Sequence, residues 1–312
     1  MEQQIANILA QTTTKTRKIQ QLLMLGLTRR QVADLVTNGN YGFVQNVYTR
    51  MNLAHQSERP TSLPNLDYTF NRRFGVEIEA YNCRMNVLVD ALREEGIQVS
   101  AENYNHTTRN HWKLVTDSSL SGNSTFELVS PVLEGQAGLN ELKKVCWVLD
   151  ACNVKVNSSC GLHVHFDAAN FSLQTWKNIA LSYKHIEPTI DKFMPESRRN
   201  NRYCCSLNRI NEQDIISATS IENLQDNAFE STRYFKVNPQ SYSRHKTIEF
   251  RQHAGSINYD KISNWVLFLN GLVTFAQQQP IATGTALNDL PFLSDEQKSF
   301  FRLRTKKLNS NG

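Results

Sequence analysis

Alternating apolar and polar residues mark several short strands in the middle of the chain. In Cys160-Gly161-Leu162-His163-Val164-His165-Phe166 the alternation has a period of two, so His163 and His165 share one face. Segments 74–79, 125–131 and 247–251 have the same apolar character, and each carries one or two carboxylates. A desolvated carboxylate is costly unless it is paired or bound to a metal. Several such strands together predict a cation site.

Helical spacing of apolar residues dominates the first part of the chain. Residues 15–51 predict three short helices, of which the first ends at Gly26. The capping box Thr28-Arg29-Arg30-Gln31 opens the second helix, and the third begins near Tyr41. This pattern resembles the helix-turn-helix of resolvases and transposases. Contact with DNA and contact with protein, or packing alone, stay open as alternatives.

After these helices the pattern predicts an α+β domain in which strands and helices alternate. A polar stretch with two prolines, residues 56–69, predicts a linker. The expected domains are a helical domain at 1–55, a catalytic domain at 70–280, and a basic C-terminal tail at 281–312 that ends in solvent. Beyond the carboxylate strands, the expected strands are 99–104, 111–115 and 234–237, and the expected helices are 85–95, 139–152, 173–192 and 259–277.

Composition narrows the class of protein. The 312 residues contain no apolar run long enough for a membrane span or a signal peptide, so we expect a cytoplasmic protein without membrane contact. The net charge is +5, and the basic excess lies within residues 1–73. The six cysteines show no CxxC spacing, which predicts buried thiols. Because the basic excess lies within residues 1–73, any tendency to bind polyanions belongs to the N-terminal segment.

An ordered set of motifs connects the strands to a known family. Taken together they resemble the amidoligase branch of the glutamate-cysteine ligase and glutamine synthetase superfamily, over roughly residues 73–275. The motifs are Gly75-Val76-Glu77-Ile78-Glu79, Trp112-x4-Asp117-Ser118-Ser119-Leu120, Glu127-Leu128-Val129-Ser130-Pro131, the strand 160–166, Arg199-x-Asn201-x-Tyr203-Cys204, Tyr234-x3-Asn238, and Thr247-Ile248-Glu249-Phe250-Arg251-x-His253.

The resemblance implies a glutamine synthetase-like catalytic domain, with a mainly antiparallel sheet flanked by helices. It implies an ATP- and Mg²⁺-dependent ligase, with Mn²⁺ as the alternative metal, that joins a carboxylate to an amine through an acyl phosphate. The product is an amide or isopeptide bond. The substrate is left open among a free amino acid, a peptide, a protein side chain and a cell-wall peptide.

The resemblance also assigns roles to individual residues. The metal ligands it implies are Glu77, Glu79, Glu127, His163 and Glu249. Arg251 would meet the transferring phosphoryl group, Glu79 would join it in catalysis, and Asp117 would receive the amine. His163 and Lys113 fall on the nucleotide side, although Lys113 and the turn at Asp117 also suit an ordinary strand end. His165 would bind the carboxylate substrate or orient a ligand. The substrate-side positions are Arg199, Asn201, Tyr203, Tyr234 and Asn238.

Several points stay open from the residues themselves. The arginine-rich run 198–202 fits either a substrate loop or a solvated loop. His253 is expected on the same strand face as Glu249 and Arg251, where it fits either a site residue or a hydrogen-bonding partner of one. A metal-dependent hydrolase is one rival function, but a set made mostly of glutamates favours Mg²⁺ or Mn²⁺ over zinc. A DNA-binding regulator with a ligand-sensing domain is the other. The missing GxxxxGK[ST] loop excludes a P-loop nucleotide site.

Overall fold

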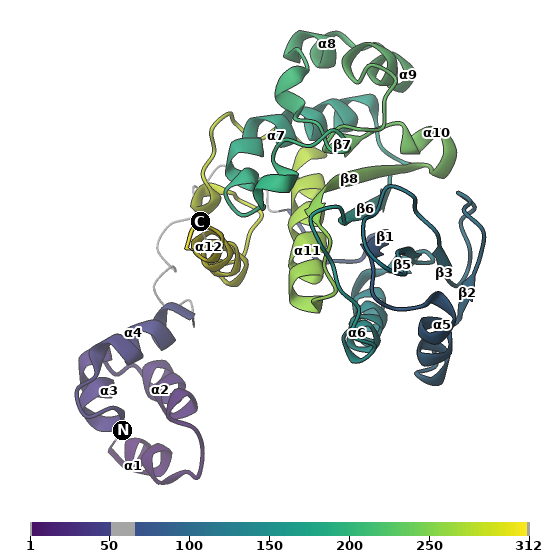
Figure 1. Ribbon diagram of the computed structural model, residues 1–312. Coiled ribbons are helices and arrows are strands. Elements are labelled where there is room, and N and C mark those ends of the chain that lie inside the picture. The colour runs from purple at the N-terminus through teal and green to yellow at the C-terminus, as the bar shows by residue number, and fades with distance from the viewer. Residues whose placement is uncertain (1, 51–65, 311–312) are drawn as a thin grey trace. The chain divides into compact units, whose positions relative to one another are not determined.

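The chain folds into two compact units in a computed structural model that describes residues 2–50 and 66–310 (Figure 1). The first unit spans residues 1–65 and the second spans 66–312. Most of the expected linker, 56–69, lies outside the described residues. No helix in the described part of the chain has both the length and the apolar character needed to cross a membrane.

Residues 2–50 of the first unit form four short helices around one small core. They are α1 (Glu2–Ala10), α2 (Lys15–Met24), α3 (Arg29–Val36) and α4 (Tyr41–Arg50). The Thr28–Gln31 capping box at the start of α3 is confirmed. Its core consists of Ile19, Leu22, Leu23, Val32, Ala33, Val44 and Val47. Helix α1 was not predicted, although its Ile5, Ile8 and Leu9 have helical spacing and pack on this core.

The second unit is built on an open, mainly antiparallel sheet, which confirms the α+β class. The strand order is β2-β3-β4-β1-β6-β8-β7, β5 pairs with β1, and β2–β3 is the parallel pair. The strands are β1 (Arg73–Ala80), β2 (Val99–Ala101), β3 (Trp112–Val115), β4 (Phe126–Val129), β5 (Leu133–Glu134), β6 (Gly161–Asp167), β7 (Val237–Asn238) and β8 (Thr247–Ala254). The expected strand 234–237 is reduced to β7, and 99–104 is reduced to β2.

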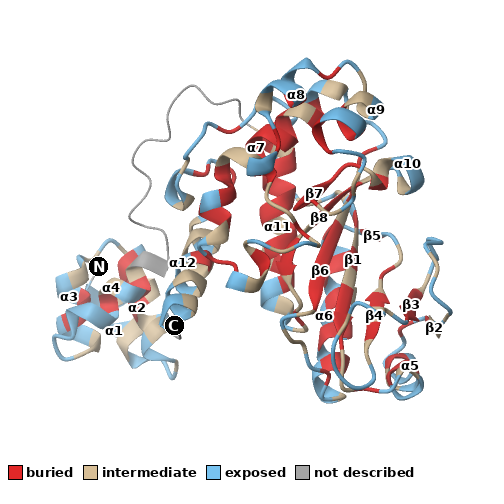
Figure 2. Ribbon diagram, turned by 45° about the horizontal axis from the view of Figure 1, so that its top comes forward, coloured by how far each residue is buried: buried red, intermediate tan, exposed pale blue. Residues whose placement is uncertain are grey.

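Helices cover the apolar side of the sheet. Four helices form a row in which each contacts the next. In order they are α5 (Met85–Glu94), α6 (Gly135–Ala151), α11 (Tyr259–Ala276) and α7 (Leu173–Asp191). The buried residues concentrate on the central strands and on α7 and α11 (Figure 2). Leu162, Val164 and Phe166 of β6 belong to this core, so the histidines between them face the other side. Shorter helical elements are η1 (Glu196–Arg198), η2 (Leu207–Arg209), α8 (Glu212–Ser217), α9 (Ile221–Asn223), the π-helical turn Leu224–Ala228, α10 (Ser241–His245) and η4 (Leu287–Asp289).

The end of the chain differs from the expected solvent-exposed tail. Residues Asp295–Asn309 form α12, which begins with a capping box at Ser294. Phe301 is buried, with its ring 4.5 Å from that of Phe193 and 5.3 Å from that of Phe268. Arg304 donates from Nε to the Phe193 carbonyl at 2.7 Å. The basic residues had suggested a solvated end, but burial of one phenylalanine is enough to dock an amphipathic helix.

A β-bulge in β8 changes which residues face the helices. Val164 pairs with Phe250, but Leu162 pairs with His253, so β8 carries one extra residue between these pairs. His253 therefore lies on the helix side, where its ring is 5.6 Å from that of Trp265. The expectation that His253 shares a face with Glu249 and Arg251 was wrong, because strict alternation does not continue through a bulge.

Candidate functional site

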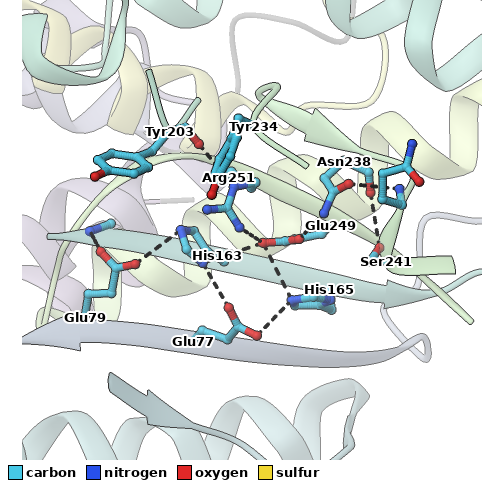
Figure 3. A network of polar contacts seen from close by, with 12 residues as sticks. Glu77, Glu79, His163, His165, Tyr203, Tyr234, Asn238, Ser241, Glu249 and Arg251 are labelled. Atoms are coloured by element: carbon cyan, nitrogen blue, oxygen red, sulfur yellow. Dashed lines mark hydrogen bonds and ion pairs between the residues drawn. The ribbon is translucent and has the colours of Figure 1, made fainter. Parts of the chain in front are cut away.

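Strand register brings the acidic residues and histidines together on the sheet face opposite the helices (Figure 3). Glu77 of β1 pairs with His163 of β6, and His165 pairs with Glu249 of β8. On the other side of β1, Glu79 pairs with Glu127 of β4. Directly paired residues project to the same face of a sheet. The residues expected to bind metal therefore form one patch across four adjacent strands.

Glu77, His163 and Glu249 form the first ligand group. One ligand atom of each lies within 4.8 Å of those of the other two. His163 Nδ1 is 2.9 Å from Glu77 Oε2 and 3.6 Å from Glu249 Oε1, and His165 Nε2 is 3.2 Å from Glu77 Oε1. Burial alone would raise the pKa of the Glu77 carboxyl. His165 and His163 outweigh burial through their charges and their hydrogen bonds, and they hold this pKa well below its usual range. The two histidines thus keep Glu77 in its carboxylate form, which is the form that can ligate a cation.

Arg251 and Asn238 hold Glu249 of the first group from two sides. Arg251 donates from Nη1 to Glu249 Oε1, and Asn238 donates from Nδ2 to Glu249 Oε2 at 2.5 Å. Arg251 also donates from Nε to the Tyr203 carbonyl at 3.2 Å. Burial raises the pKa of Glu249, but Arg251 and His165 outweigh it and leave the pKa lowered. The guanidinium is thereby fixed beside the first group.

Glu79, Glu127 and His163 form the second ligand group, again with ligand atoms within 4.8 Å of one another. Glu79 Oε1 is 3.6 Å from His163 Nε2, and Glu79 Oε2 accepts the Gly161 N–H at 2.5 Å. Glu127 forms no hydrogen bond or ion pair with any residue that the structure describes. Burial, followed by the charges of Glu77 and Glu79, raises its pKa well above the usual value. A bound divalent cation would relieve this repulsion, and the oxygen-rich donor set fits Mg²⁺ or Mn²⁺.

A cavity of about 260 Å³ adjoins both ligand groups. Its walls include Glu77 of the first group, Glu127 of the second group, His165 and Lys113, and residues 105–108 line it as well. The sheet face that carries the ligands thus offers a concave space that reaches both groups. Pockets of this kind, with a few convergent polar groups, are typical of ligand sites.

Comparison with known proteins identifies the family of the second unit. A family model described as "Putative amidoligase enzyme" matches residues 70–273, which is more than half of the chain. The chain belongs to this amidoligase family. The amidoligase match contains every strand of the sheet and both ligand groups, whereas the first helical unit and α12 lie outside it. No functionally curated protein matches the sequence.

Two of the expected amidoligase residues form hydrogen bonds outside the ligand groups, although Lys113 lines the cavity. The Lys113 ammonium donates to Asn105 Oδ1 and to the carbonyls of Asn105 and Thr107, at 2.8–3.0 Å, so it anchors the loop that lines the cavity. Asp117 accepts the Ser119 N–H at 2.7 Å in a local turn, and it forms no hydrogen bond or ion pair with either ligand group. Its charge nevertheless contributes to the raised pKa of Glu127. Asp117 therefore lies beside the second group and not within it.

The expected substrate positions divide into two sets. The Tyr203 and Tyr234 rings meet edge to face at 5.9 Å and stand next to Arg251 (Figure 3). Arg199 instead donates to the Met194 carbonyl, and Asn201 donates to the Ser197 carbonyl, so both stabilise their own loop. The structure brings Tyr203, Tyr234, Asn238 and His165 to the site, and it gives Arg199 and Asn201 no contact with either ligand group.

Sequence reasoning missed Arg198 and the steric role of Gly161. Arg198 is only 2% exposed and donates to backbone carbonyls of β8. A Cβ at Gly161 would lie 3.0 Å from Arg198 Nη2, 3.1 Å from His163 Nε2 and 3.3 Å from Glu79 Oε2. Nothing in the arginine-rich run separates Arg198 from its neighbours. The glycine before the two histidines was the one available signal, because a residue without a side chain leaves room for a close approach.

Proposed function

We propose that the amidoligase unit is an ATP- and Mg²⁺-dependent carboxylate–amine ligase on a glutamine synthetase-like fold. One observation carries the proposal: two carboxylate–histidine ligand groups share His163, and Arg251 is fixed beside the first of them. Phosphoryl transfer requires divalent cations, which would neutralise the phosphate oxygens, and a positioned guanidinium beside the transferred group. This set of residues supplies both requirements within one patch.

In this proposal the first ligand group and its cavity hold ATP. Glu77 is both a member of that group and a wall of the cavity, so a nucleotide bound in the cavity can bring its phosphates to Glu77, His163 and Glu249. Arg251, already aligned by Glu249 and by the Tyr203 carbonyl, then faces the γ-phosphate. His165 reaches Glu77 from the cavity side and is itself held by Thr247 through Nδ1, at 3.0 Å.

The second ligand group lies on the carboxylate and amine side. The γ-phosphoryl group passes from ATP to the substrate carboxylate, and the amine then attacks the acyl carbon. A C–N bond forms, phosphate leaves, and the amine loses a proton. The position of Asp117 beside Glu127 supports the role of receiving the amine, and Glu79 is paired with Glu127 in the second group. The two tyrosines next to Arg251 line the approach of the carboxylate.

Calorimetry with a non-hydrolysable ATP analogue tests the nucleotide site. We expect the native protein to bind the analogue in the presence of Mg²⁺, and Glu77→Ala to lose this binding. The control is Glu95→Ala, which removes an exposed carboxylate at the end of α5. Failure of the native protein to bind, together with stoichiometric zinc by metal analysis, would replace the ligase proposal with the hydrolase alternative.

The first helical unit supports a separate proposal, that residues 15–51 contact DNA. The sequences of α1–α4 contain six basic residues, Lys15, Arg17, Lys18, Arg29, Arg30 and Arg50, against Glu2 and Asp34. Fluorescence anisotropy with a labelled DNA duplex at two salt concentrations tests this. We expect binding that weakens steeply as salt rises. Salt-independent binding, or no binding, would favour protein contact instead.

A further inference from the structure

The bulge in β8 lies at Arg251 and Gln252. Arg251 and Gln252 both lie opposite His163, and their side chains go to opposite faces of the sheet. Arg251 reaches Glu249 at the site, whereas Gln252 accepts from the Tyr183 hydroxyl at 2.6 Å and donates to Asp191 on the helix side. A bulge interrupts the regular ladder, so the carbonyls of the two residues need other donors.

One buried guanidinium supplies those donors. Arg198 donates from Nε to the Gln252 carbonyl at 3.2 Å and from Nη2 to the Arg251 carbonyl. Its side chain forms no ion pair with any carboxylate that the structure describes. A buried charge without a counter-ion is unfavourable, so a generic packing role does not explain an arginine here. Its contacts match the two carbonyls that the bulge exposes.

A second buried network fixes the neighbouring strand. The Arg251 N–H donates to the Lys236 carbonyl at 2.9 Å. The Lys236 ammonium is fully buried and lies 2.8 Å from both Glu187 Oε1 and Asp191 Oδ1 of α7. Asp191 also accepts from Gln252. The backbone around Arg251 is thus tied to α7 through Gln252 and Lys236, and to the 196–198 turn through Arg198.

We infer that Arg198 is a positioning residue: by holding the carbonyls of the bulge, it sets the direction in which Arg251 points. The inference rests on the proposed function, in which Arg251 meets the γ-phosphate. Arg198 itself touches backbone and not the reacting groups. Its Nη2 borders Gly161 at the edge of the second ligand group, but its hydrogen bonds go to the backbone of the strand that carries Arg251.

Hydrogen exchange of the full-length protein tests the structural half of this inference. In Arg198→Lys the single ammonium cannot reproduce the two-carbonyl fork. We expect amide exchange in residues 248–254 to become about tenfold faster. The matched control is Arg304→Lys, since Arg304 also donates from Nε to a backbone carbonyl but lies on α12. Unchanged exchange in Arg198→Lys would overturn the inference.

Nucleotide preference tests the functional half. We expect native protein to bind the β,γ-imido analogue of ATP more tightly than ADP when Mg²⁺ is present. Arg198→Lys should lower this preference by about tenfold, and it should add no further loss in an Arg251→Met background. A purely structural role would weaken both nucleotides equally, and additive losses would show that Arg198 does not act through Arg251.

The outcomes separate this inference from the proposed function. Faster exchange with a lost triphosphate preference supports both. Faster exchange with an unchanged preference overturns the positioning role of Arg198. If the native protein binds no nucleotide while exchange in Arg198→Lys still rises, the proposed function fails and the control of the bulge by Arg198 stands. Arg198→Met is the harsher variant, and the lysine variant retains the positive charge if the methionine variant does not fold.

Discussion

The two ligand groups share His163 but differ in how their carboxylates are held. In the first group Glu77 is met by two histidines, and Glu249 is met by Arg251 and Asn238, so both pKa values are lowered. In the second group Glu127 has no partner among the described residues, and its pKa is raised. The first group is organised by the protein itself, whereas the second depends more on a bound cation. We expect mutations to affect the two groups differently.

The largest effect is expected from removing the Arg251 guanidinium, which holds Glu249 of the first group. Arg251→Ala should lower ligation by at least about 10³-fold, because a positioned arginine stabilises phosphoryl transfer by this order. Glu249→Ala should be similarly severe. The check is ADP formation with a carboxylate–amine pair that the native protein accepts, with circular dichroism to verify the fold. Near-normal turnover in either variant would show that the site is assigned wrongly.

Gly161→Ala tests the side chains that border both groups. The new methyl carbon would lie 3.0–3.3 Å from Arg198 Nη2, His163 Nε2 and Glu79 Oε2, so these atoms must move apart. We expect affinity for the Mg²⁺–nucleotide analogue to fall by about 10–100-fold, since small displacements in a catalytic site are costly. The control Gly42→Ala has no neighbour closer than 3.6 Å at the new carbon. Equal calorimetric affinities for Gly161→Ala and native protein would contradict the close packing at Gly161.

Glu127→Gln tests the difference between the two ligand groups through the thermal stability of the protein. A carboxyl with a raised folded-state pKa destabilises the fold at any pH above its unfolded value, which is near 4.3 for glutamate. In EDTA at pH 7 the neutral amide should therefore raise the melting temperature by about 2–4 °C, the change expected for ~1 kcal/mol in a unit of this size. Added Mg²⁺ should then stabilise the native protein more than the variant. Identical melting curves in EDTA and in Mg²⁺ would remove the second group as a cation site.

The smallest effect is expected at the loop that lines the cavity beside the first group. Hydrogen bonds from Arg109, Asn105 and Ser100 lower the pKa of Glu102 to about 2. A lowered pKa stabilises the fold above the unfolded value near 4.3, and this contribution is lost as the pH falls toward 2. Glu102→Gln should destabilise the protein at pH 7 by no more than ~0.5 kcal/mol, because the pair is screened by solvent. Urea unfolding at pH 7 and pH 3 checks this, and a difference that grows at pH 3 would contradict it.

The sequence by itself determined the elements and most of the candidate ligands. Period-two alternation located β1, β4, β6 and β8 and placed His163 and His165 on one face, because side chains of a strand alternate. Helical spacing and the capping box located α2, α3 and α4. These signals are local, so they can be recognised without knowing what each element packs against. The order of the motifs then pointed to the amidoligase family, which the family match confirms.

Only the tertiary structure decided which residues meet, because partners are chosen by register and not by sequence distance. The bulge in β8 turned His253 toward Trp265 and left two carbonyls that Arg198 satisfies. The fold also engaged Lys113 with the loop at 105–107 and docked α12 through Phe301. Each of these outcomes depends on a contact between segments or on an irregularity in strand pairing. A pattern within one segment carries no information about either.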